Sequence, residues 1–387
     1  MRIKLFERWM VRWIMAVVCL GFSGATFADW NVREDGMILH NGEPVFLVGL
    51  YQINSPADVA VIAKAGFNWG TAKYTLGSDI TRLDKIIDAA ERHHIFIQVS
   101  VSSEDVVAAR LTARYRDRAG VISFDAEDDA DDEKYRSFAQ VRAKAQAIRR
   151  TAPGKLAYLS LTAWSPKRRA EGRKWLSIVD LAGVQSYPIT PIPGYSYQKG
   201  AAGPLEENFD RLCHYMNLLP PHCAFIPNLQ AFSWADNGRR DARYPTPREL
   251  RNFTYTALIT GARGILYYRL PNLREQKALW AELKMIVREL KRLHGPMLTT
   301  GKRTMVDTGE RFIKAAIWTG KKGDYLVVIN VHETEKKKVS FKLDHSSAGH
   351  GRLIPVFLNR PKGLWLRNGK IVGSLKAGDV HVYKVLN

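Results

Sequence analysis

The chain has 387 residues, a formal net charge of +20 at pH 7 and 25% charged residues. This length fits one large domain and one small domain, and the excess of Lys and Arg favours an anionic partner such as an acidic polysaccharide, a lipid headgroup or nucleic acid. After the N-terminal leader no segment approaches the length of a transmembrane helix, which excludes stable membrane insertion through a later segment.

Residues 1–28 have the pattern of a secretory signal peptide. Four bases are followed by an apolar run over 14–22 and by small residues that end at Ala28, the order that precedes a cleavage site. The apolar run is too short to cross a bilayer comfortably, and an uncleaved anchor is the alternative. We expect cleavage after Ala28 and a periplasmic or secreted protein.

The positive charge favours an anionic partner, for which an anionic polysaccharide or oligosaccharide is one candidate. Nucleic acid is not expected, because an exported protein seldom meets it and the bases are spread over many helices without a basic arm. A merely solvated basic surface is the alternative. Cys213 and Cys223 remain after cleavage, and an oxidising compartment permits a disulfide between them without requiring it. The cysteines and scattered histidines form no ligand set, so we expect no metal and no cofactor.

A repeating pattern follows the Asn41-Gly42 hairpin signal. Short apolar runs alternate with amphipathic segments of helical length, eight times in about 250 residues, which predicts a (β/α)8 TIM barrel. The strands are expected near 45–51, 67–74, 95–101, 120–127, 156–163, 181–188, 223–231 and 263–269. The helices are expected near 56–65, 80–93, 103–117, 132–151, 165–179, 204–218, 247–260 and 274–293. A doubly wound open sheet is the alternative, but the Gly-rich phosphate loop that it normally carries is missing.

The pattern changes after Gly295-Pro296, where strand-like segments replace the helices. They predict a small antiparallel β-sandwich that packs on the barrel. The expected organisation is therefore a signal peptide over 1–28, a barrel catalytic domain over 29–297 and a β-sandwich domain over 298–387.

The fourth strand carries the clearest chemical signal. Alternation along a strand predicts that Phe124 and Ala126 face the helices, while Ser123, Asp125 and Glu127 face the barrel interior. Unpaired carboxylates inside a strand are costly, so Asp125 and Glu127 indicate a wet, functional pocket where the barrel opens to solvent. Most of the acidic run that follows is expected to be surface.

Polar and aromatic residues at the other strand ends predict a sugar-binding rim, because flat aromatic faces suit sugar rings. The expected substrate-binding residues are Tyr51, Lys73, Gln98, Trp164, Gln185, Asn228, Gln230, Trp234, Tyr268 and Arg269.

Four segments resemble the glycoside hydrolase-like (β/α)8 barrel superfamily: DGMILHNGEPVFLVGLYQ, ISFDAEDD, VQSYP and PTPRELRNFTYTALITGARGILYY. The resemblance covers most of the mature chain and implies hydrolysis of glycosidic bonds. Gln230 stands where many such barrels have a strand-seven carboxylate. Asp125-Ala126-Glu127 and Tyr187 are similar to the Asp-x-Glu and Tyr of chitinase-like families, although Val121 and Ser123 replace the further Asp residues of that signature.

These residues suggest a mechanism in which Glu127 is the general acid. In a substrate-assisted version, Asp125 orients an N-acetyl group of the sugar and Tyr187 donates to its oxygen. In an inverting version, Asp128 or another loop carboxylate is the base, about 6.5–9.5 Å from the acid.

Two other functions compete with hydrolysis. One is a non-catalytic polysaccharide-binding protein of a synthesis or secretion system, which an ion pair between Glu127 and an Arg favours. The other is a polysaccharide lyase with Tyr187 or Lys73 as base and Arg269 to neutralise the uronate. An open groove with Asp125 and Glu127 at its floor favours the hydrolase.

Overall fold

A computed structural model describes residues 29–101, 105–132, 134, 136–162, 165–190, 201–239, 241–343 and 352–386. The signal peptide and Trp164, both predicted above, lie outside these residues. Among the described residues, no helix is long and apolar enough to cross a bilayer.

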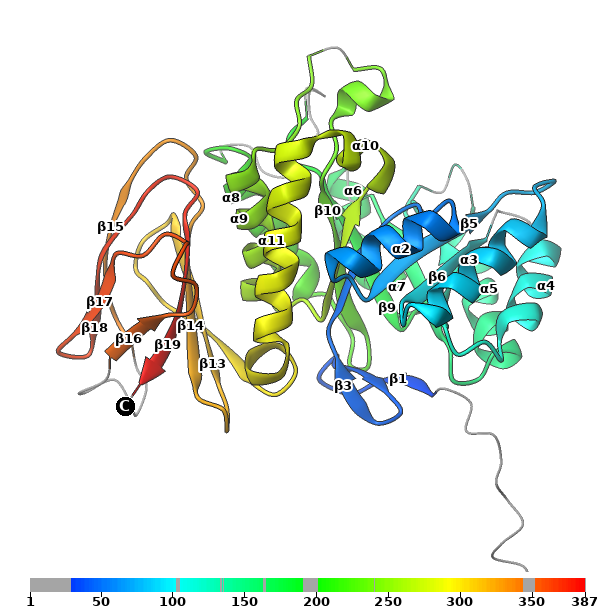
Figure 1. Ribbon diagram of the computed structural model, residues 1–387, viewed down its shortest axis with the longest axis horizontal. Helices are drawn as coiled ribbons and strands as arrows, with labels where there is room; N and C mark the ends of the chain where they lie inside the picture. The colour runs from blue at the N-terminus through cyan, green and yellow to red at the C-terminus, as the bar shows by residue number, and fades with distance from the viewer. Residues whose placement is uncertain are drawn as a thin grey trace, which may run out of the picture.

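Eight parallel strands close into a barrel in the order β10-β11-β4-β5-β6-β7-β8-β9. The strands are β4 (Leu47–Leu50), β5 (Trp69–Tyr74), β6 (Phe96–Val101), β7 (Val121–Glu127), β8 (Leu156–Leu161), β9 (Leu181–Ser186), β10 (Ala224–Gln230) and β11 (Gly264–Tyr268). The helices around them are α2 (Pro56–Ala65), α3 (Ile80–Arg92), α4 (Asp105–Tyr115), α5 (Phe138–Thr151), α6 (Pro166–Ala170), α7 (Gly172–Leu176), α8 (Pro204–Met216), α9 (Pro247–Thr260), α10 (Leu270–Glu275) and α11 (Lys277–Leu293). Figure 1 shows the barrel and its helices to the right of a separate β-layer.

The predicted barrel is confirmed, and capping side chains explain where two of its helices begin. Ser55 accepts a hydrogen bond from the backbone N–H of Asp58, with Pro56 in the first helical turn. Thr246 and Glu249 form a reciprocal capping box at the start of α9. The helix expected over 165–179 is instead two short helices, α6 and α7, separated at Glu171.

A small antiparallel sheet closes the N-terminal end of the barrel. It consists of β1 (Trp30–Val32), β2 (Ile38–His40) and β3 (Glu43–Val45). Trp30 is buried with Ile38 against the lowest interior side chains of the barrel strands, among them Trp69 and Leu266. This apolar layer fills the lower half of the barrel, so polar chemistry is confined to the opposite, C-terminal end.

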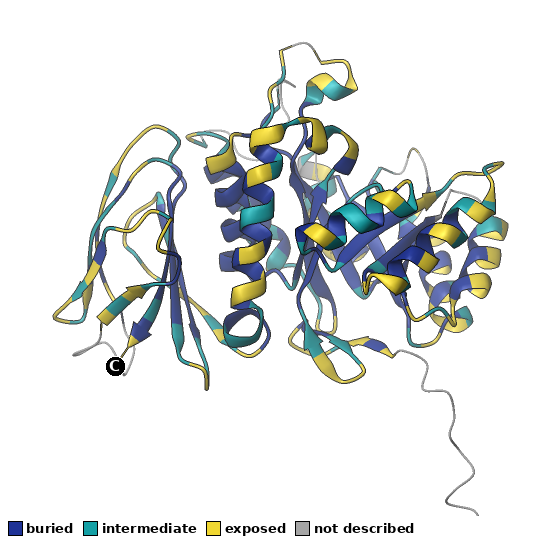
Figure 2. Ribbon diagram, viewed as in Figure 1, coloured by how far each residue is buried: buried dark blue, intermediate teal, exposed yellow. Residues whose placement is uncertain are grey.

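Two antiparallel sheets form the C-terminal sandwich, as predicted. The first contains β12 (Lys302–Val306), β13 (Ile313–Thr319), β14 (Asp324–Asn330), β19 (Val380–Leu386) and β16 (Arg352–Pro355), in that order. The second has the order β15 (Lys337–Lys342), β18 (Lys370–Leu375), β17 (Leu364–Arg367). The first sheet lies between the helices of the barrel and the second sheet (Figure 1). Figure 2 shows buried residues concentrated in the barrel strands and on the inner side of the helices.

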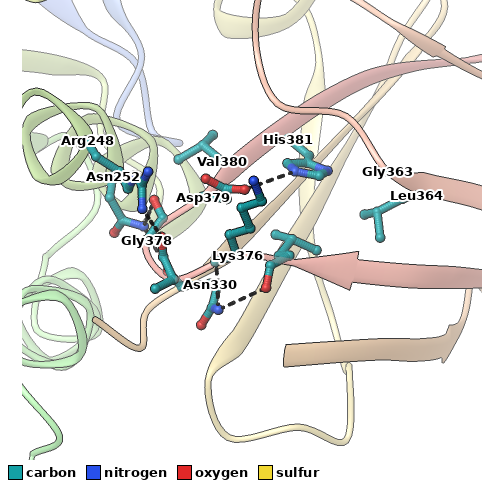
Figure 3. Close-up of polar contacts among 12 residues, drawn as sticks. Arg248, Asn252, Asn330, Gly363, Leu364, Lys376, Gly378, Asp379, Val380 and His381 are labelled. Carbon is teal, nitrogen blue, oxygen red and sulfur yellow. Dashed lines mark hydrogen bonds and ion pairs between the residues drawn. The ribbon is translucent and has the colours of Figure 1, made fainter. Parts of the chain in front are cut away.

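The barrel and the sandwich meet through polar side chains of α9. Asn252 Nδ2 donates to the backbone carbonyls of Asn330 at 3.0 Å and Gly378 at 3.2 Å. Arg251 Nη1 donates to the carbonyl of Val380 at 2.8 Å. Figure 3 shows α9 side chains reaching the turn before β19. These bonds fix the turn by its backbone, beside an apolar contact in which Phe253 of α9 and Ile329 and Val380 of the sandwich belong to one buried cluster.

Cys213 and Cys223 are not bonded to each other. Cys213 lies in α8 and Cys223 directly precedes β10, and both are free. Burial raises the pKa of the Cys223 thiol, which keeps it protonated and poorly reactive.

Candidate active site

A β-bulge in β7 decides which carboxylates face the barrel interior. In the register with β8, Asp125 lies opposite Tyr158, but Glu127 lies opposite Leu159, the next residue. One extra residue in a strand turns the side chains that follow it. Asp125 points inward, where its Oδ2 accepts a hydrogen bond from Ser100 Oγ of β6 at 2.9 Å.

The prediction that Glu127 shares the inward face with Asp125 is wrong. Its Oε2 lies 3.0 Å from Arg136 Nε and 4.0 Å from Lys144 Nζ, and Lys144 belongs to α5. Arg136 also pairs with Asp105 at the start of α4, at 2.6 Å. Glu127 therefore faces the helix layer next to two cations, although burial outweighs their attraction and raises the pKa of its carboxyl.

Asp128 and Asp129 take the inward position instead. Asp128 Oδ2 accepts a hydrogen bond from the Tyr51 hydroxyl at 2.7 Å, and Asp129 Oδ1 accepts one from Gln185 Nε2 at 2.5 Å. Tyr51 follows β4 and Gln185 lies in β9, on opposite sides of β7 in the closed strand order. The two aspartates therefore lie over the barrel interior. Asp129 adopts the left-handed backbone conformation, with φ of +56°, in which the chain turns across the barrel end.

The protonation of this cluster follows from its burial. Burial and then the charge of Asp128 raise the pKa of Asp129 to about 7. The same two causes raise the pKa of Asp125. Carboxyls that share a site with little water do not all ionise at once, so one of them retains a proton at neutral pH.

Two phenols next to the aspartates remain proton donors. Burial and the charge of Asp128 hold the pKa of Tyr51 and of Tyr158 well above the usual range. The Tyr158 hydroxyl donates to Asn228 Oδ1 at 3.0 Å. A methyl group at Gly183 of β9 would collide with that hydroxyl, so the glycine leaves the space that Tyr158 occupies.

A hydrogen-bond chain forms the floor of the candidate site. Asn228 Nδ2 donates to Ser160 Oγ at 3.1 Å. Gln185 Nε2 lies 3.4 Å from the same oxygen and also reaches Asp129. Tyr158, Ser160, Gln185 and Asn228 come from three adjacent strands, which fixes their spacing. The floor therefore holds Asp129 in one orientation.

Aromatic side chains form one wall beside the aspartates. The Tyr268 ring lies 5.1 Å from that of Tyr51, 5.7 Å from that of Tyr187 and 5.0 Å from that of Phe232, between ring centroids. Trp234 packs against Tyr187 at 6.3 Å. Tyr51, Tyr187, Trp234 and Tyr268 were all predicted from sequence, and the structure brings them together.

Other predicted residues lie apart or have backbone partners. Gln230 is fully buried, and its amide bonds the backbone of Ile189 and Phe232. It thus fixes the segment after β9 and is not open to a ligand. Arg269 donates to Asn272 at 2.6 Å and lies over the Tyr268 ring.

Gln98 and Lys73 are the last two residues that the sequence predicted to bind substrate. Gln98 is buried in the barrel interior, and its Oε1 has no hydrogen-bond partner among the described residues. Lys73 is exposed at the end of β5. Within the described part of the chain, no group of three His, Cys, Asp or Glu residues could hold a metal ion.

Sequence reasoning missed Asp129 and Tyr158, and gave Asp128 only a secondary role. Tyr158 has the same strand parity as Ser160, so alternation along β8 could have found it. Nothing in the local sequence marks the bulge that brings Asp129 inward.

The fold defines the class of architecture: a (β/α)8 barrel followed by a β-sandwich, as in glycoside hydrolases. No family model and no curated protein matches the chain. Among solved structures, one described as a glycoside hydrolase is 15% identical with a TM-score of 0.62, over 94% of this chain and 97% of that one.

Two further structures show the same likeness. A glycoside hydrolase family 5 protein from Bacteroides vulgatus has 17% identity and a TM-score of 0.64, covering 93% of each chain. A family 27 β-L-arabinopyranosidase from Geobacillus stearothermophilus has 11% identity and a TM-score of 0.60, covering 88% of this chain and 96% of that one. At these identities the likeness establishes the fold, and the resemblance predicted from sequence is confirmed at that level.

Proposed function

We propose that this chain is an exported glycoside hydrolase whose general acid is Asp129. The observation that carries the proposal is the difference between two neighbouring carboxyls. Asp129 is held by Gln185 with a pKa raised to about 7, and Asp128 accepts from the Tyr51 phenol. Glycoside hydrolysis needs one carboxyl that is protonated and another that meets the developing positive charge.

In this mechanism Asp129 protonates the leaving glycosidic oxygen. A donor with a pKa near the working pH is the most effective. Asp128 then acts as the carboxylate that attacks the anomeric carbon or activates water. Asp125 lies beneath them, bonded to Ser100, and its raised pKa favours its protonated form at neutral pH. The half-buried ring of Tyr268 receives the apolar face of a sugar, and the buried ring of Tyr187 supports it.

Glu127, although predicted from sequence as the acid, is not assigned that role. Arg136 and Lys144 already occupy its carboxylate, and both are nearly fully buried. A protonated Glu127 would leave the buried Lys144 without this carboxylate and Arg136 with Asp105 alone.

The test is incubation of the purified protein with a panel of bacterial and host glycans, with products read by mass spectrometry. The proposal expects a hydrated product from the native chain and from Glu127→Gln, and none from Asp129→Asn. Full activity of Asp129→Asn would overturn the assignment. An unsaturated product would replace hydrolysis by elimination.

A non-catalytic polysaccharide-binding protein is the second candidate. The Glu127–Arg136 ion pair favours it, because a carboxylate neutralised in this way has no chemistry to perform. This candidate predicts binding without any product, and binding that survives Asp129→Asn. A lyase receives less support, because Arg269 is engaged by Asn272 and Tyr268.

Export rests on the leader alone. Cleavage after Ala28 is checked by N-terminal sequencing of the protein recovered from the periplasm or the medium. A chain that keeps residues 1–28 in the cytoplasm would contradict it.

A further inference from the structure

The second sheet of the sandwich, β15-β18-β17, has one face open to solvent. Side chains that point inward are apolar and belong to the sandwich core: Val339, Phe341, Leu364, Ile371 and Leu375. The side chains that alternate with them form what we call the outer sheet face: Lys338, Ser340, Lys342, Trp365, Arg367, Lys370, Val372 and Ser374. In Figure 1 this sheet lies at the left end of the molecule, away from the barrel.

A row of cations crosses the outer sheet face. Lys370 of β18 is paired in register with Lys342 of β15 on one side and with Arg367 of β17 on the other. Neighbouring strands are about 4.8 Å apart, and like charges directly opposite each other are destabilising. The three strands contain no Asp or Glu. The positive potential of this row is therefore not cancelled within the sheet.

Within the part of the chain that the structure describes, the cation row has no carboxylate partner. Of the residues that the structure describes, none forms an ion pair with Lys342, Arg367 or Lys370, and Lys338 is likewise unpaired there. The whole segment 298–387 has 17 Lys and Arg against seven Asp and Glu. It thus supplies half of the net charge of the chain in less than a quarter of its length.

An exposed tryptophan stands beside the cations. Trp365 is 55% exposed, lies opposite Val372 and is two residues from Arg367 on the same face. A large aromatic ring left in water on a flat sheet is unfavourable in the free protein. Ser340 and Ser374 add hydroxyl groups around it.

We propose that the outer sheet face binds an extended strand of anionic polysaccharide. The Trp365 ring stacks on one sugar, the cation row pairs with carboxylates of the polymer, and the two serines bond sugar hydroxyls. A flat sheet admits an extended chain, and one isolated ring offers little to insert into a bilayer. The choice of a sugar polymer over a nucleic acid rests on the proposed function of the barrel.

The experiment is affinity electrophoresis of the chain, purified after expression with its own leader, in gels containing alginate, a linear polyuronate. The same protein is run with neutral dextran, with single-stranded DNA and with phosphatidylglycerol vesicles. We expect retardation by alginate but not by dextran. Trp365→Ala should weaken alginate binding at least tenfold, and Arg367→Glu with Lys370→Glu should weaken it further and flatten its salt dependence.

Matched controls separate this surface from general attraction. Lys321→Glu with Lys322→Glu makes the same charge change at exposed positions in the turn between β13 and β14. Leu358→Ala shortens another apolar side chain, 77% exposed. Both controls should bind alginate as the native chain does. Equal loss in the controls, or no loss in Trp365→Ala, overturns the proposal. If DNA or vesicles bind more tightly than alginate and this binding depends on Trp365, the partner is not an anionic polysaccharide.

The two proposals fail separately. Asp129→Asn should lower turnover strongly and leave alginate retardation unchanged. A protein that binds alginate through Trp365 but releases no product contradicts only the barrel proposal. A protein that hydrolyses a glycan and binds alginate equally well with Trp365→Ala contradicts only the surface.

Discussion

The barrel end and the outer sheet face concentrate charge in opposite ways. At the barrel end Asp125 and Asp129 lie among phenols and amides, where burial dominates and raises the pKa of both carboxyls. On the outer sheet face the cations stand in solvent, where repulsion between neighbours is weak and screened by salt. The comparison indicates which variable reports on each region: pH for the barrel end and ionic strength for the sheet.

The largest expected effect is on turnover. Asp129→Asn removes the proton donor and should lower kcat about 10²–10⁴-fold, measured on whichever glycan the panel identifies. Asp128→Asn should also lower kcat, because it removes the second carboxylate. It also withdraws a charge that raises the pKa of Asp129. Any residual activity of Asp128→Asn should therefore decline at a lower pH than that of the native chain. An unshifted decline would show that the two residues are not coupled.

The next effect is on stability and distinguishes the two faces of β7. Glu127→Gln leaves Arg136 and Lys144 without their shared carboxylate. Removing one member of a largely buried ion pair leaves its partners unsatisfied, while the neutral Gln escapes the burial cost that raises the pKa of Glu127. The free energy of unfolding should therefore fall by about 1–3 kcal/mol, measured by urea denaturation. The matched control is Asp132→Asn, whose pair with Arg168 is about one-quarter exposed on each side and should cost less. Unchanged stability in Glu127→Gln would contradict the assignment of Glu127 to the helix layer beside Arg136 and Lys144.

The fold could be read from the sequence, because it depends on many weak signals that agree. Eight apolar runs and their helices fell close to the observed elements, and capping residues such as Ser55 and Thr246 marked helix starts. The aromatic wall was predicted as well, since residues at strand ends converge in any closed barrel.

The chemical centre could not be read in the same way, because it depends on one residue of register. A regular β7 places Asp125 and Glu127 together, whereas the bulge replaces Glu127 by Asp128 and Asp129. The energies that select the bulge are tertiary: Lys144 on α5 attracts Glu127, and Gln185 on β9 bonds Asp129. Neither contact is local in sequence.

The outer sheet face was missed for a different reason. The strands β17 and β18 are short and polar, and the turn at Asn368-Gly369 joins them. Unless both strands are predicted, the sequence does not show which side of the sheet Trp365 faces. It also does not show which residues lie opposite Lys370.

The third effect is the pH dependence of stability. The pKa of Asp129 is raised in the folded chain, from 3.8 to about 7. Its contribution to stability is therefore present in full below pH 3.8 and is lost progressively as the pH rises through about 7. Asp129→Asn lacks this loss. The difference in urea midpoint between the variant and the native chain should thus move in favour of the variant between pH 4 and 7 and level off above. A constant difference would mean that Asp129 has an ordinary pKa.

The smallest effect concerns the outer sheet face. Lys370→Gln removes the middle cation of the row and so relieves repulsion with both Lys342 and Arg367. A slight rise in Tm is expected at low salt, and it should disappear at high ionic strength, where the charges are already screened. The matched control, Lys322→Gln, removes an exposed cation that has no cross-strand partner and should leave Tm unchanged at both salt concentrations. If Lys370→Gln lowers Tm instead, Lys370 makes a favourable contact in the folded protein. The three cations then do not destabilise the sheet by repelling one another. The same substitution should weaken alginate binding. Stability should therefore rise while affinity falls at this one position. Such opposite changes are expected of a charge that serves a ligand and not the stability of the fold.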